Sequence, residues 1–399
     1  MNKVKKIQKM LAQMPSHAIT PVKTQRVSSL ERYLTTHYEF RFNLLTEQTE
    51  FRVIGEECSE FQVIGKRELN TLSFEISRNG IKCGIGEFTR YLQSSFIEEY
   101  HPFRLYLQTL PRWDGKDRLT DLAMRVSHQP LWVKGFHRWM LALTAQWMGR
   151  DQVHANSVAP LLISTEQGMM KSTFCKSLMP EALQAYYTDQ ADLSAKGNIE
   201  SKLALMGLIN LDEFDRLSPQ RMAQLKNLMQ MPSLNIRKAY QKNFRSLPRI
   251  ASFIGTSNRK DLLTDPTGSR RFLCVEVEQK IDCAHIDLNQ IYAQLKAELL
   301  AGKPYWFSSE EEEEIQQHNA SFYQVCPEEE LFRARFRAPQ TSESYEELSL
   351  VDILDELRES HAHLLRHVDY KQFGAALVSA GIERVHTRFG NRYKVTRVA

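Results

Sequence analysis

The sequence has no long apolar run and no paired cysteines, and these absences exclude several classes of protein. No window approaches the ~20 apolar residues that a membrane-spanning helix needs. The six cysteines include no C-x-x-C pair and no zinc-ligand spacing, so we expect reduced thiols rather than a disulfide framework. The basic N-terminus, MNKVKKIQKMLAQMPSH, lacks the apolar segment of a signal peptide. A cytoplasmic protein without a membrane anchor is therefore expected.

An excess of charge of one sign is also missing. The 399 residues carry 52 Lys and Arg against 48 Asp and Glu, a net charge of +4. Any site for a polyanion must therefore be a local concentration of basic side chains. The length and the hydrophobic content of 42% allow a sizeable core and more than one domain.

Two glycines are missing from a stretch that otherwise looks like a phosphate-binding loop. The stretch LLISTEQGMMKSTF opens like a buried strand and ends like the start of a helix. Aligned on Lys171, the pattern G-x-x-x-x-G-K-[ST] asks for glycine at Thr165 and Met170. Gly168 and Lys171-Ser172-Thr173 remain. By itself the motif leaves two interpretations open: a phosphate cradle, in which backbone amides, the positive end of a helix and a lysine meet the anion, or an ordinary helix start.

The cradle interpretation assigns nucleotide contacts to seven consecutive residues: Gln167, Gly168, Met169, Met170, Lys171, Ser172 and Thr173. A side chain at Met170 is compatible with a cradle if it points away from the phosphates and the backbone there stays right-handed. We therefore expect ATP binding to survive the missing glycine, and turnover to suffer, because the loop must come closest to the γ-phosphate in the transition state.

Two later strands supply the polar residues that a nucleotide hydrolase requires. GLINLDEFD places Asp212 and Glu213 at the end of one apolar strand, and SFIGTSN places Asn258 at the end of another. In such enzymes the first acid and the loop hydroxyl, here Ser172, hold Mg²⁺, and the second acid polarises the attacking water. Asn258 would orient that water. The alternative is a strand that ends in a solvated Asp-Glu pair.

The segment TGSRRF follows the Asn258 strand and contains Arg270 and Arg271. An arginine at this point in the chain order can reach the γ-phosphate that a neighbouring subunit binds. A surface basic pair is the alternative.

The alternation of short apolar strands with helices predicts an α/β fold, a P-loop NTPase core with a mainly parallel sheet flanked by helices. In the N-terminal part, YEFRFNLLT, EFRVIG, EFQVIG and LSFEIS are expected as strands and GEFTRYLQSSFIEEY as a helix. The expected domains are a basic arm (1–28), an N-terminal α+β region (29–100), a helical lead-in (101–150), the ATPase core (151–305), an acidic helix and linker (306–345) and a winged-helix-like domain (346–399).

Several of these motifs, taken together, resemble the virulence-associated E family. They are HPFRLYLQTLPRWDGKDRL, QGMMKSTF, NLDEFD, IRKAY, PRIASFIGTSN and TGSRRF, within a stretch from roughly Tyr33 to RRFLCVEV. The family comprises P-loop ATPases of phages, plasmids and integrative elements, related to superfamily 3 helicases and often encoded with a primase. The resemblance implies catalytic roles for Lys171, Glu213, Asn258 and the Arg270/Arg271 pair, and a metal-binding role for Ser172 and Asp212. Met170 departs from the family glycine.

Two basic segments are candidates for contact with DNA. IRKAYQKNFRSLPR contains Lys238, Tyr240, Lys242 and Arg245, which suit a loop that tracks single-stranded DNA, while Arg237 and Arg249 are expected to brace the nucleotide site or a subunit contact. In superfamily 3 helicases a hairpin here lines the channel of a ring. The C-terminal hairpin, expected to turn at Gly390-Asn391, offers Arg388, Arg392 and Lys394 to duplex DNA, with protein docking as the alternative.

The sequence thus predicts a ring-forming ATPase that moves or melts DNA during replication of a phage or integrative element, with ATP and Mg²⁺ as cofactors and a primase as partner. The alternative is a DNA-binding initiator or regulator that holds nucleotide with little turnover.

Overall fold

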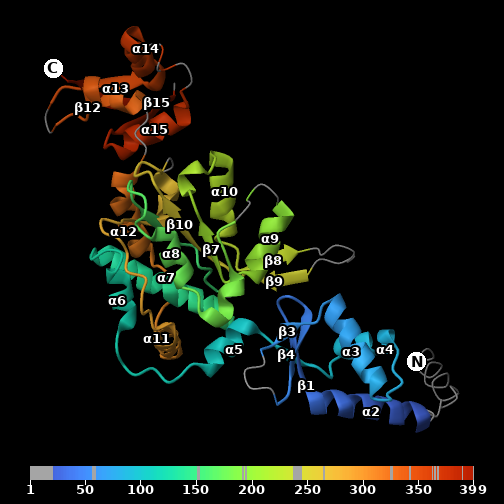
Figure 1. Cartoon of the computed structure of the whole chain (residues 1–399). Coiled ribbons are helices and arrows are strands. Elements are labelled where there is room, and N and C mark those ends of the chain that lie inside the picture. Colours follow the sequence, from blue (N-terminus) through green and yellow to red (C-terminus); the bar gives the residue numbers. More distant parts are fainter. Residues whose placement is uncertain are drawn as a thin grey trace, which may run out of the picture. The chain divides into compact units, whose positions relative to one another are not determined.

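The computed structural model in Figure 1 divides the chain into two compact units, residues 1–105 and residues 106–399. The structure describes residues 21–55, 60–150, 153–190, 193, 196–236, 245–263, 266–323, 327–340, 343–361, 363, 365, 368–388 and 390–398. Within these ranges no helix combines the length and the apolar character needed to cross a membrane.

The first unit is an α+β unit with one four-stranded sheet in the order β3-β2-β1-β4. Its elements are α2 (Pro21–His37), β1 (Tyr38–Asn43), β2 (Gln48–Val53), β3 (Gln62–Val63), α3 (Lys66–Arg78), α4 (Ile85–Leu92) and β4 (Glu98–Tyr100). Strands β1 and β2 form an antiparallel hairpin, and β4 runs parallel to β1. Leucines and aromatic residues of α2, α3 and α4 form the core of this unit.

Two expectations for this unit are wrong. LSFEIS, expected as a strand, belongs to α3, because Leu72 and Ile76 are buried four residues apart on one helical face while Phe74 between them is 68% exposed. The helix expected to continue to residue 100 ends at Leu92. The hydroxyl of Ser94 donates to the carbonyl of Tyr91, which favours a helix end, and Glu98–Tyr100 then pairs with β1.

The second unit contains a parallel five-stranded sheet in the order β11-β5-β10-β7-β6. Its strands are β5 (Ala159–Ile163), β6 (Tyr187–Thr188), β7 (Leu208–Leu211), β10 (Ser252–Ser257) and β11 (Phe272–Glu276). Every residue of β5, β7 and β10 is buried, as expected for a parallel sheet covered on both faces. The predicted α/β class, with a parallel sheet flanked by helices, is confirmed.

Helices and short 3-10 turns surround this sheet, and α7 and α8 pack directly against its strands. The helices are α5 (Pro102–Thr109), α6 (Arg118–Met124), α7 (Pro130–Met148), α8 (Lys171–Ser177), α9 (Lys196–Leu205), α10 (Pro219–Leu228), α11 (Leu288–Leu300) and α12 (Ser309–His318). The 3-10 turns are η1 (Glu181–Tyr186), η2 (Phe214–Arg216), η3 (Pro266–Arg271) and η4 (Asn319–Phe322). A separate antiparallel pair, β8 (Ser233–Ile236) and β9 (Arg245–Pro248), precedes β10.

The order of the sheet brings three chain segments to one edge. Strand β10 lies between β5 and β7, and its last residue, Ser257, pairs with Ile163 at the end of β5. Because the carboxyl ends of parallel strands meet at the same edge of a sheet, the residues that follow β5, β7 and β10 lie close together there.

The C-terminal part of the chain has a small sheet and a core of its own. Its elements are α13 (Pro327–Arg335), β12 (Phe336–Arg337), β13 (Glu346–Ser349), α14 (Leu350–His361), α15 (Tyr370–Ser379), β14 (Arg384–Thr387) and β15 (Gly390–Arg397). Strand β15 pairs with β12, β13 and β14, and Phe332 and Phe336 join the core. The boundary expected at residue 346 thus lies between two strands of one sheet.

The turn of the last hairpin is displaced from the expected position. Thr387 pairs with Gly390, so Gly390 and Asn391 already belong to the returning strand and do not form the turn. Gly390 begins the returning strand at a φ of 112°, a conformation that favours glycine. The Gly-Asn pair predicts a turn, but in the structure the glycine is the first residue of β15.

The cysteines in the described ranges agree with the expectation of reduced thiols. Cys83, Cys175, Cys274 and Cys283 are free, and two of them, Cys175 and Cys274, are buried. Cys58 and Cys326 lie outside the described residues.

Candidate functional site

A cavity of about 310 Å³ lies where β5, β7 and β10 end. Its lining consists of Gln167, Gly168, Met169, Met170, Lys171, Ser172, Thr173, Asp212, Glu213, Thr256 and Asn258. The structure therefore brings together all seven loop residues, both acids and Asn258, as the sequence predicts. Thr256 is an addition that the sequence reasoning missed.

Lys171 is the most enclosed charged group of the cavity, at 8% exposure. Its Nζ donates to the carbonyl of Ser164 (3.2 Å) and to Oδ1 of Asn258 (2.9 Å). Burial lowers the pKa of Lys171, and the nearby carboxylates of Asp212 and Asp215 oppose that shift. A desolvated ammonium held only by neutral oxygens gains strongly from an added anion.

The backbone of the loop takes two left-handed residues to reach α8. Gly168 has a φ of 78° and Met170 a φ of 62° with a ψ of 21°. The right-handed backbone at Met170, named above as a condition for a cradle with a side chain there, is therefore not present. Met170 adopts the conformation for which glycine is preferred, at a cost of roughly 1–2 kcal/mol for a residue with a Cβ. The loop thus keeps a glycine-like shape without the glycine.

The loop is also held from outside. The amide of Ile281 donates to the carbonyl of Met169 (3.3 Å), and the amide of Val277 donates to the carbonyl of Ile163 (2.7 Å). The segment after β11 therefore fixes both ends of the loop. Helix α8 has only 7 residues, so Lys171 and the loop shape contribute more to an anion site here than the helix dipole does.

Three oxygen-bearing side chains converge beside Lys171. Oδ1 of Asp212 accepts hydrogen bonds from Oγ of Ser172 (3.1 Å) and from Oγ1 of Thr256. Carboxylate and hydroxyl oxygens are the ligands that Mg²⁺ prefers. The pair predicted for the metal, Ser172 and Asp212, is thus in contact, and Thr256 orients the carboxylate. The only sequence signal for Thr256 is its place two residues before Asn258.

Glu213 lines the cavity but its carboxylate is engaged. Its Oε2 lies 2.7 Å from Nη1 of Arg216, and both side chains are well exposed, at 47% and 75%. An exposed pair of this kind contributes only about 0–1 kcal/mol, so Glu213 can exchange Arg216 for another partner. The backbone of Glu213 is left-handed, with a φ of 52°, which is uncommon outside glycine and marks a constrained position.

A second missed residue is Asp215, which is hydrogen-bonded to Ser257, the residue before Asn258. Its Oδ1 accepts from Oγ of Ser257 (2.9 Å), and the same hydroxyl accepts from the amide of Arg259 (3.0 Å). These bonds fix the chain on both sides of Asn258 and so aim its side chain at Lys171. The signal in the sequence is weak, because Asp215 is merely the third acid of LDEFD.

Arg270 and Arg271 do not reach this cavity in their own chain. They end η3 and directly precede Phe272, which pairs with Ala159 at the first residue of β5. They therefore lie at the amino end of the sheet, whereas Lys171 follows the carboxyl end of β5. Nε of Arg270 lies 3.4 Å from Oε2 of Glu312 on α12.

Of the residues predicted to contact single-stranded DNA, only Arg245, in β9, lies within the described ranges; Lys238, Tyr240 and Lys242 lie outside them, as does Arg237. Arg249 is fully buried, and its Nη2 donates to the carbonyl of Asn156 (2.9 Å). It lies before β10, at the opposite end from Asn258. The expectation that Arg249 braces the nucleotide site or a subunit contact is therefore wrong: it ties β10 to the segment before β5.

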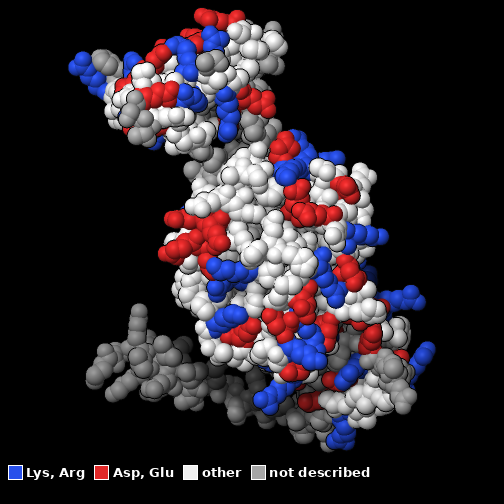
Figure 2. Space-filling model, turned by 90° about the vertical axis from the view of Figure 1, so that its left-hand side faces the viewer, with Lys and Arg blue, Asp and Glu red and all other residues white. Residues whose placement is uncertain are grey.

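The basic residues of the C-terminal hairpin have partners within the chain. Nη1 of Arg392 donates to the carbonyl of Glu347 (2.9 Å), and Nζ of Lys394 lies 2.6 Å from Oε1 of Glu383, a hydrogen bond that raises the pKa of Lys394. Arg388, in the hairpin turn, is likewise not free of interactions within the protein. On the face in Figure 2, Lys and Arg are largely interspersed with Asp and Glu. The DNA-contact role of this hairpin stays a prediction.

The part of the chain that contains the cavity is similar to a known protein family. Residues 107–324 match the virulence-associated protein E-like domain. The chain belongs to this family. The match contains the whole five-stranded parallel sheet and every residue of the cavity. It begins within α5, well after Tyr33, where the resemblance was expected to begin. No curated protein matches the chain.

The chain is also similar to a second domain family and to solved structures of one protein. Residues 325–395 match a domain of unknown function from B. Theta (DUF3874). An apo structure of the C-terminal region of NrS-1 covers 92% of this chain and 98% of its own, at 14% identity and a TM-score of 0.45. A second apo form of the same region has 13% identity and a TM-score of 0.44, with the same coverage. At this level of similarity no role of that protein carries over to this chain.

Proposed function

We propose that this virulence-associated protein E-like chain is an ATPase that acts on DNA during replication of a phage or related mobile element. The observation that carries the proposal is the buried Lys171, which shares one cavity with the Ser172–Asp212–Thr256 cluster and Asn258. A lysine among neutral acceptors beside a hydroxyl–carboxylate pair suits a nucleotide phosphate and its metal ion. Family membership supports the replication context.

We infer a role for each side chain from its place in the cavity. Lys171 would pair with the β- and γ-phosphates, Ser172 and Asp212 would hold Mg²⁺, and Glu213 would take a proton from the attacking water once it leaves Arg216. Asn258 would orient that water; it lines the same cavity, and its Oδ1 accepts from Lys171 Nζ at 2.9 Å. Bound Mg²⁺ supplies charge neutralisation on the phosphate oxygens.

Two features favour a ring over an isolated subunit. Arg270 and Arg271 are remote from the cavity of their own chain, yet an arginine near the γ-phosphate is a common requirement of such sites. A neighbouring subunit can supply it. The β8–β9 hairpin precedes β10, the strand that Asn258 follows, and we propose that the basic residues between β8 and β9 contact single-stranded DNA in the channel of such a ring. A primase remains the partner that we expect from the family.

One observation favours the alternative, a nucleotide-holding initiator or regulator with little turnover. Met170 places a side chain at a left-handed position of the loop, where close approach to the γ-phosphate would need glycine. Binding of the β-phosphate would survive this, whereas transition-state contacts would weaken.

Hydrolysis measured with and without single-stranded DNA separates the two proposals. For the ATPase we expect measurable phosphate release that DNA raises several-fold and that Lys171→Ala abolishes. Thr120→Ala, which leaves the cavity untouched, is a control for the purified preparation. Nucleotide binding without DNA-stimulated release would support the regulator, and absence of nucleotide binding would overturn both.

A further inference from the structure

A second and larger cavity, of about 550 Å³, lies between the end of α7 and the segment that follows α11. Arg150, Lys303, Tyr305 and Trp306 supply its side chains of chemical interest, and the described lining includes no Asp or Glu. It shares no residue with the phosphate cavity. A volume of this size suits a ligand as large as a nucleotide.

The aromatic wall of this cavity is held in place yet remains open. Trp306 is 39% exposed, and its ring stacks on His154 with centroids 4.4 Å apart and planes 17° apart. Tyr305 meets Trp306 edge to face at 5.4 Å and donates from its hydroxyl to the carbonyl of Arg150 (3.0 Å). A preorganised, half-exposed indole is a platform on which another flat ring can stack.

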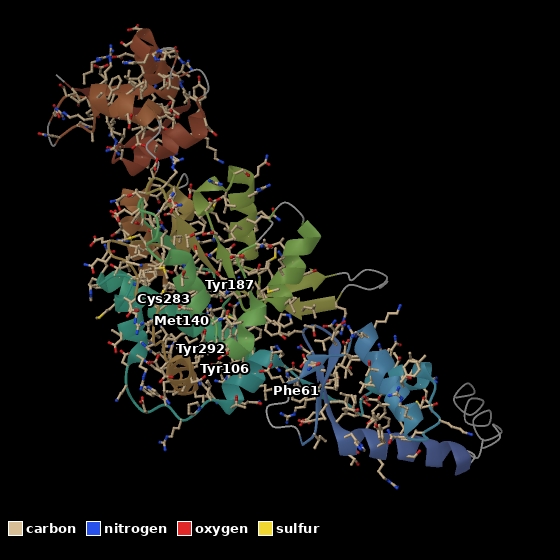
Figure 3. The ribbon with its side chains drawn as sticks, viewed as in Figure 1. Phe61, Tyr106, Met140, Tyr187, Cys283 and Tyr292 are labelled. Atoms are coloured by element: carbon tan, nitrogen blue, oxygen red, sulfur yellow. The ribbon has the colours of Figure 1, made fainter. Side chains whose placement is uncertain are left out.

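The frame behind this wall is rigid. Trp147 of α7 stacks on Tyr292 of α11 at 5.0 Å, and Tyr106 packs edge to face on Tyr292 at 5.7 Å. Tyr106 and Tyr292 are seen side by side in Figure 3. These contacts pack the end of α7 against the first half of α11, and the cavity lies beside the ends of the same two helices.

The described lining of the cavity carries two cations, Arg150 and Lys303. Arg150 forms no ion pair with any described residue, whereas Lys303 Nζ lies 3.0 Å from Oε2 of Glu298. Both cations follow helix C-termini, whose partial negative charge they offset. The electrostatics therefore favour a ligand with a single phosphate over a polyphosphate, and stacking on Trp306 would supply most of the affinity.

The segment that carries His154 is hydrogen-bonded to residues that follow the β8–β9 hairpin. His154 of the aromatic wall lies two residues before Asn156, whose carbonyl accepts from Nη2 of Arg249, the residue directly after β9. The side-chain Nδ2 of Asn156 also donates to Oγ of Ser252 at the start of β10 (2.9 Å). Hydrogen bonds thus connect the segment beside the stacking platform to the base of the hairpin.

We propose that this cavity binds one nucleotide unit of single-stranded DNA, with the base on Trp306 and its phosphate near Arg150. The proposal deepens the proposed function, since it adds a base-stacking contact beside the hairpin. A free mononucleotide has the same chemistry as one unit of a strand, so the test includes both.

The experiment measures binding of a fluorescent oligothymidylate without ATP, together with photocrosslinking of an iododeoxyuridine-substituted strand. Trp306→Ala should weaken binding about tenfold, within the range of losses that follow removal of a stacking platform. Trp306→Phe should retain most of the affinity because a ring remains. Trp113→Ala, at a partly exposed tryptophan elsewhere, is the matched control and should bind as wild type does.

Crosslinks mapped by mass spectrometry to Tyr305 or Trp306 would support the assignment. If Trp306→Ala binds as tightly as Trp113→Ala and no crosslink maps to this wall, the inference is wrong while DNA binding by the protein stands. If thymidine monophosphate saturates the cavity but the strand does not crosslink there, the strand assignment is also wrong. A wild-type protein that binds no oligonucleotide would contradict this site and the DNA part of the proposed function, while its hydrolysis of ATP is judged separately.

Discussion

Met170 has a backbone conformation that glycine adopts easily and a Cβ that this conformation disfavours. Its φ of 62° lies in the left-handed region, while the loop around it is held by Ile281 and by the Lys171 contacts. Strain of this kind persists when surrounding contacts determine the conformation. At the scale of the single residue, the loop is therefore shaped by its neighbours as much as by its own sequence.

Substitution of Met170 tests this account. Met170→Gly and Met170→Ala both remove the side chain beyond Cβ, but only glycine removes the left-handed strain. We expect the glycine variant to be more stable than the alanine variant by roughly 0.5–1 kcal/mol, after the entropy of glycine in the unfolded chain is subtracted. Chemical denaturation of the two proteins measures the difference.

The same glycine variant should keep ATP affinity within a few-fold of wild type and raise basal turnover, because contacts made only in the transition state act on turnover. An alanine variant at least as stable as the glycine variant, or a glycine variant that hydrolyses more slowly than wild type, would contradict the role given to Met170.

Lys171 gives a prediction in pH. Because burial lowers its pKa, the folded protein releases this proton at a lower pH than the unfolded chain, where lysine titrates near 10.4. Between the two values the unfolded chain binds more protons, so this group makes stability rise with pH. The unfolding free energy of wild type minus that of Lys171→Met should therefore increase from pH 8 to pH 10.5. A difference that is flat or falls over this range would refute a depressed pKa.

Among the site residues, polar side chains that directly follow an apolar strand or form part of a motif could be predicted from the sequence. Residues of common types in ordinary places could not. Lys171, Asp212 and Asn258 follow apolar strands, so their meeting at one edge follows from parallel pairing. Thr256 and Asp215 act through hydrogen bonds across strands. A threonine within a strand and a third acid after one are too common for the sequence to single out.

At the scale of the element, the wrong secondary-structure predictions come from patterns judged over only a few residues. The six residues of LSFEIS alternate in polarity and so fit a strand, but Leu69, Leu72 and Ile76 have helical spacing over the wider segment. The parallel sheet was easier to predict because its strands are continuous apolar runs between helices. The parallel pairing of β4 with β1 depends on residues more than fifty positions apart, which no local pattern specifies.

The β8–β9 hairpin carries the predicted contact with single-stranded DNA. Replacement of Lys238, Lys242 and Arg245 by alanine should weaken binding and reduce the slope of log K against log salt by about 2, since each phosphate contact releases roughly 0.7 counterion. Basal hydrolysis should persist. Alanine at Lys66, Arg67 and Arg78, three exposed cations of α3, is the matched control. Equal affinity and slope in the hairpin variant and the control would remove the hairpin from the DNA contact.

At the scale of the whole molecule, the role proposed for Arg270 and Arg271 at the γ-phosphate would need a second subunit, because both residues lie at the opposite end of the sheet from the cavity of their own chain. The ion pair of Arg270 with Glu312 is partly exposed, at 47% and 28%, and so costs little to break. Lys171→Ala subunits mixed with Arg270→Ala/Arg271→Ala subunits should regain part of the hydrolysis, because some interfaces then combine an intact loop with intact arginines.

Subunits that carry all three substitutions, mixed with Lys171→Ala subunits, offer no intact loop and should stay inactive. If mixed assemblies form and no ratio of the two single-defect proteins hydrolyses ATP, the arginines do not act across an interface.

The most direct test of the central claim is a calorimetric titration of the protein with ATP and Mg²⁺, in the presence and absence of single-stranded DNA. The cavity predicts saturable binding by wild type that Lys171→Ala weakens greatly, since the buried ammonium is the main charge that faces the phosphates. If the wild-type protein binds neither ATP nor ADP under either condition, the segment from Gln167 to Thr173 is an ordinary helix start. The proposal that this protein is an ATPase is then contradicted.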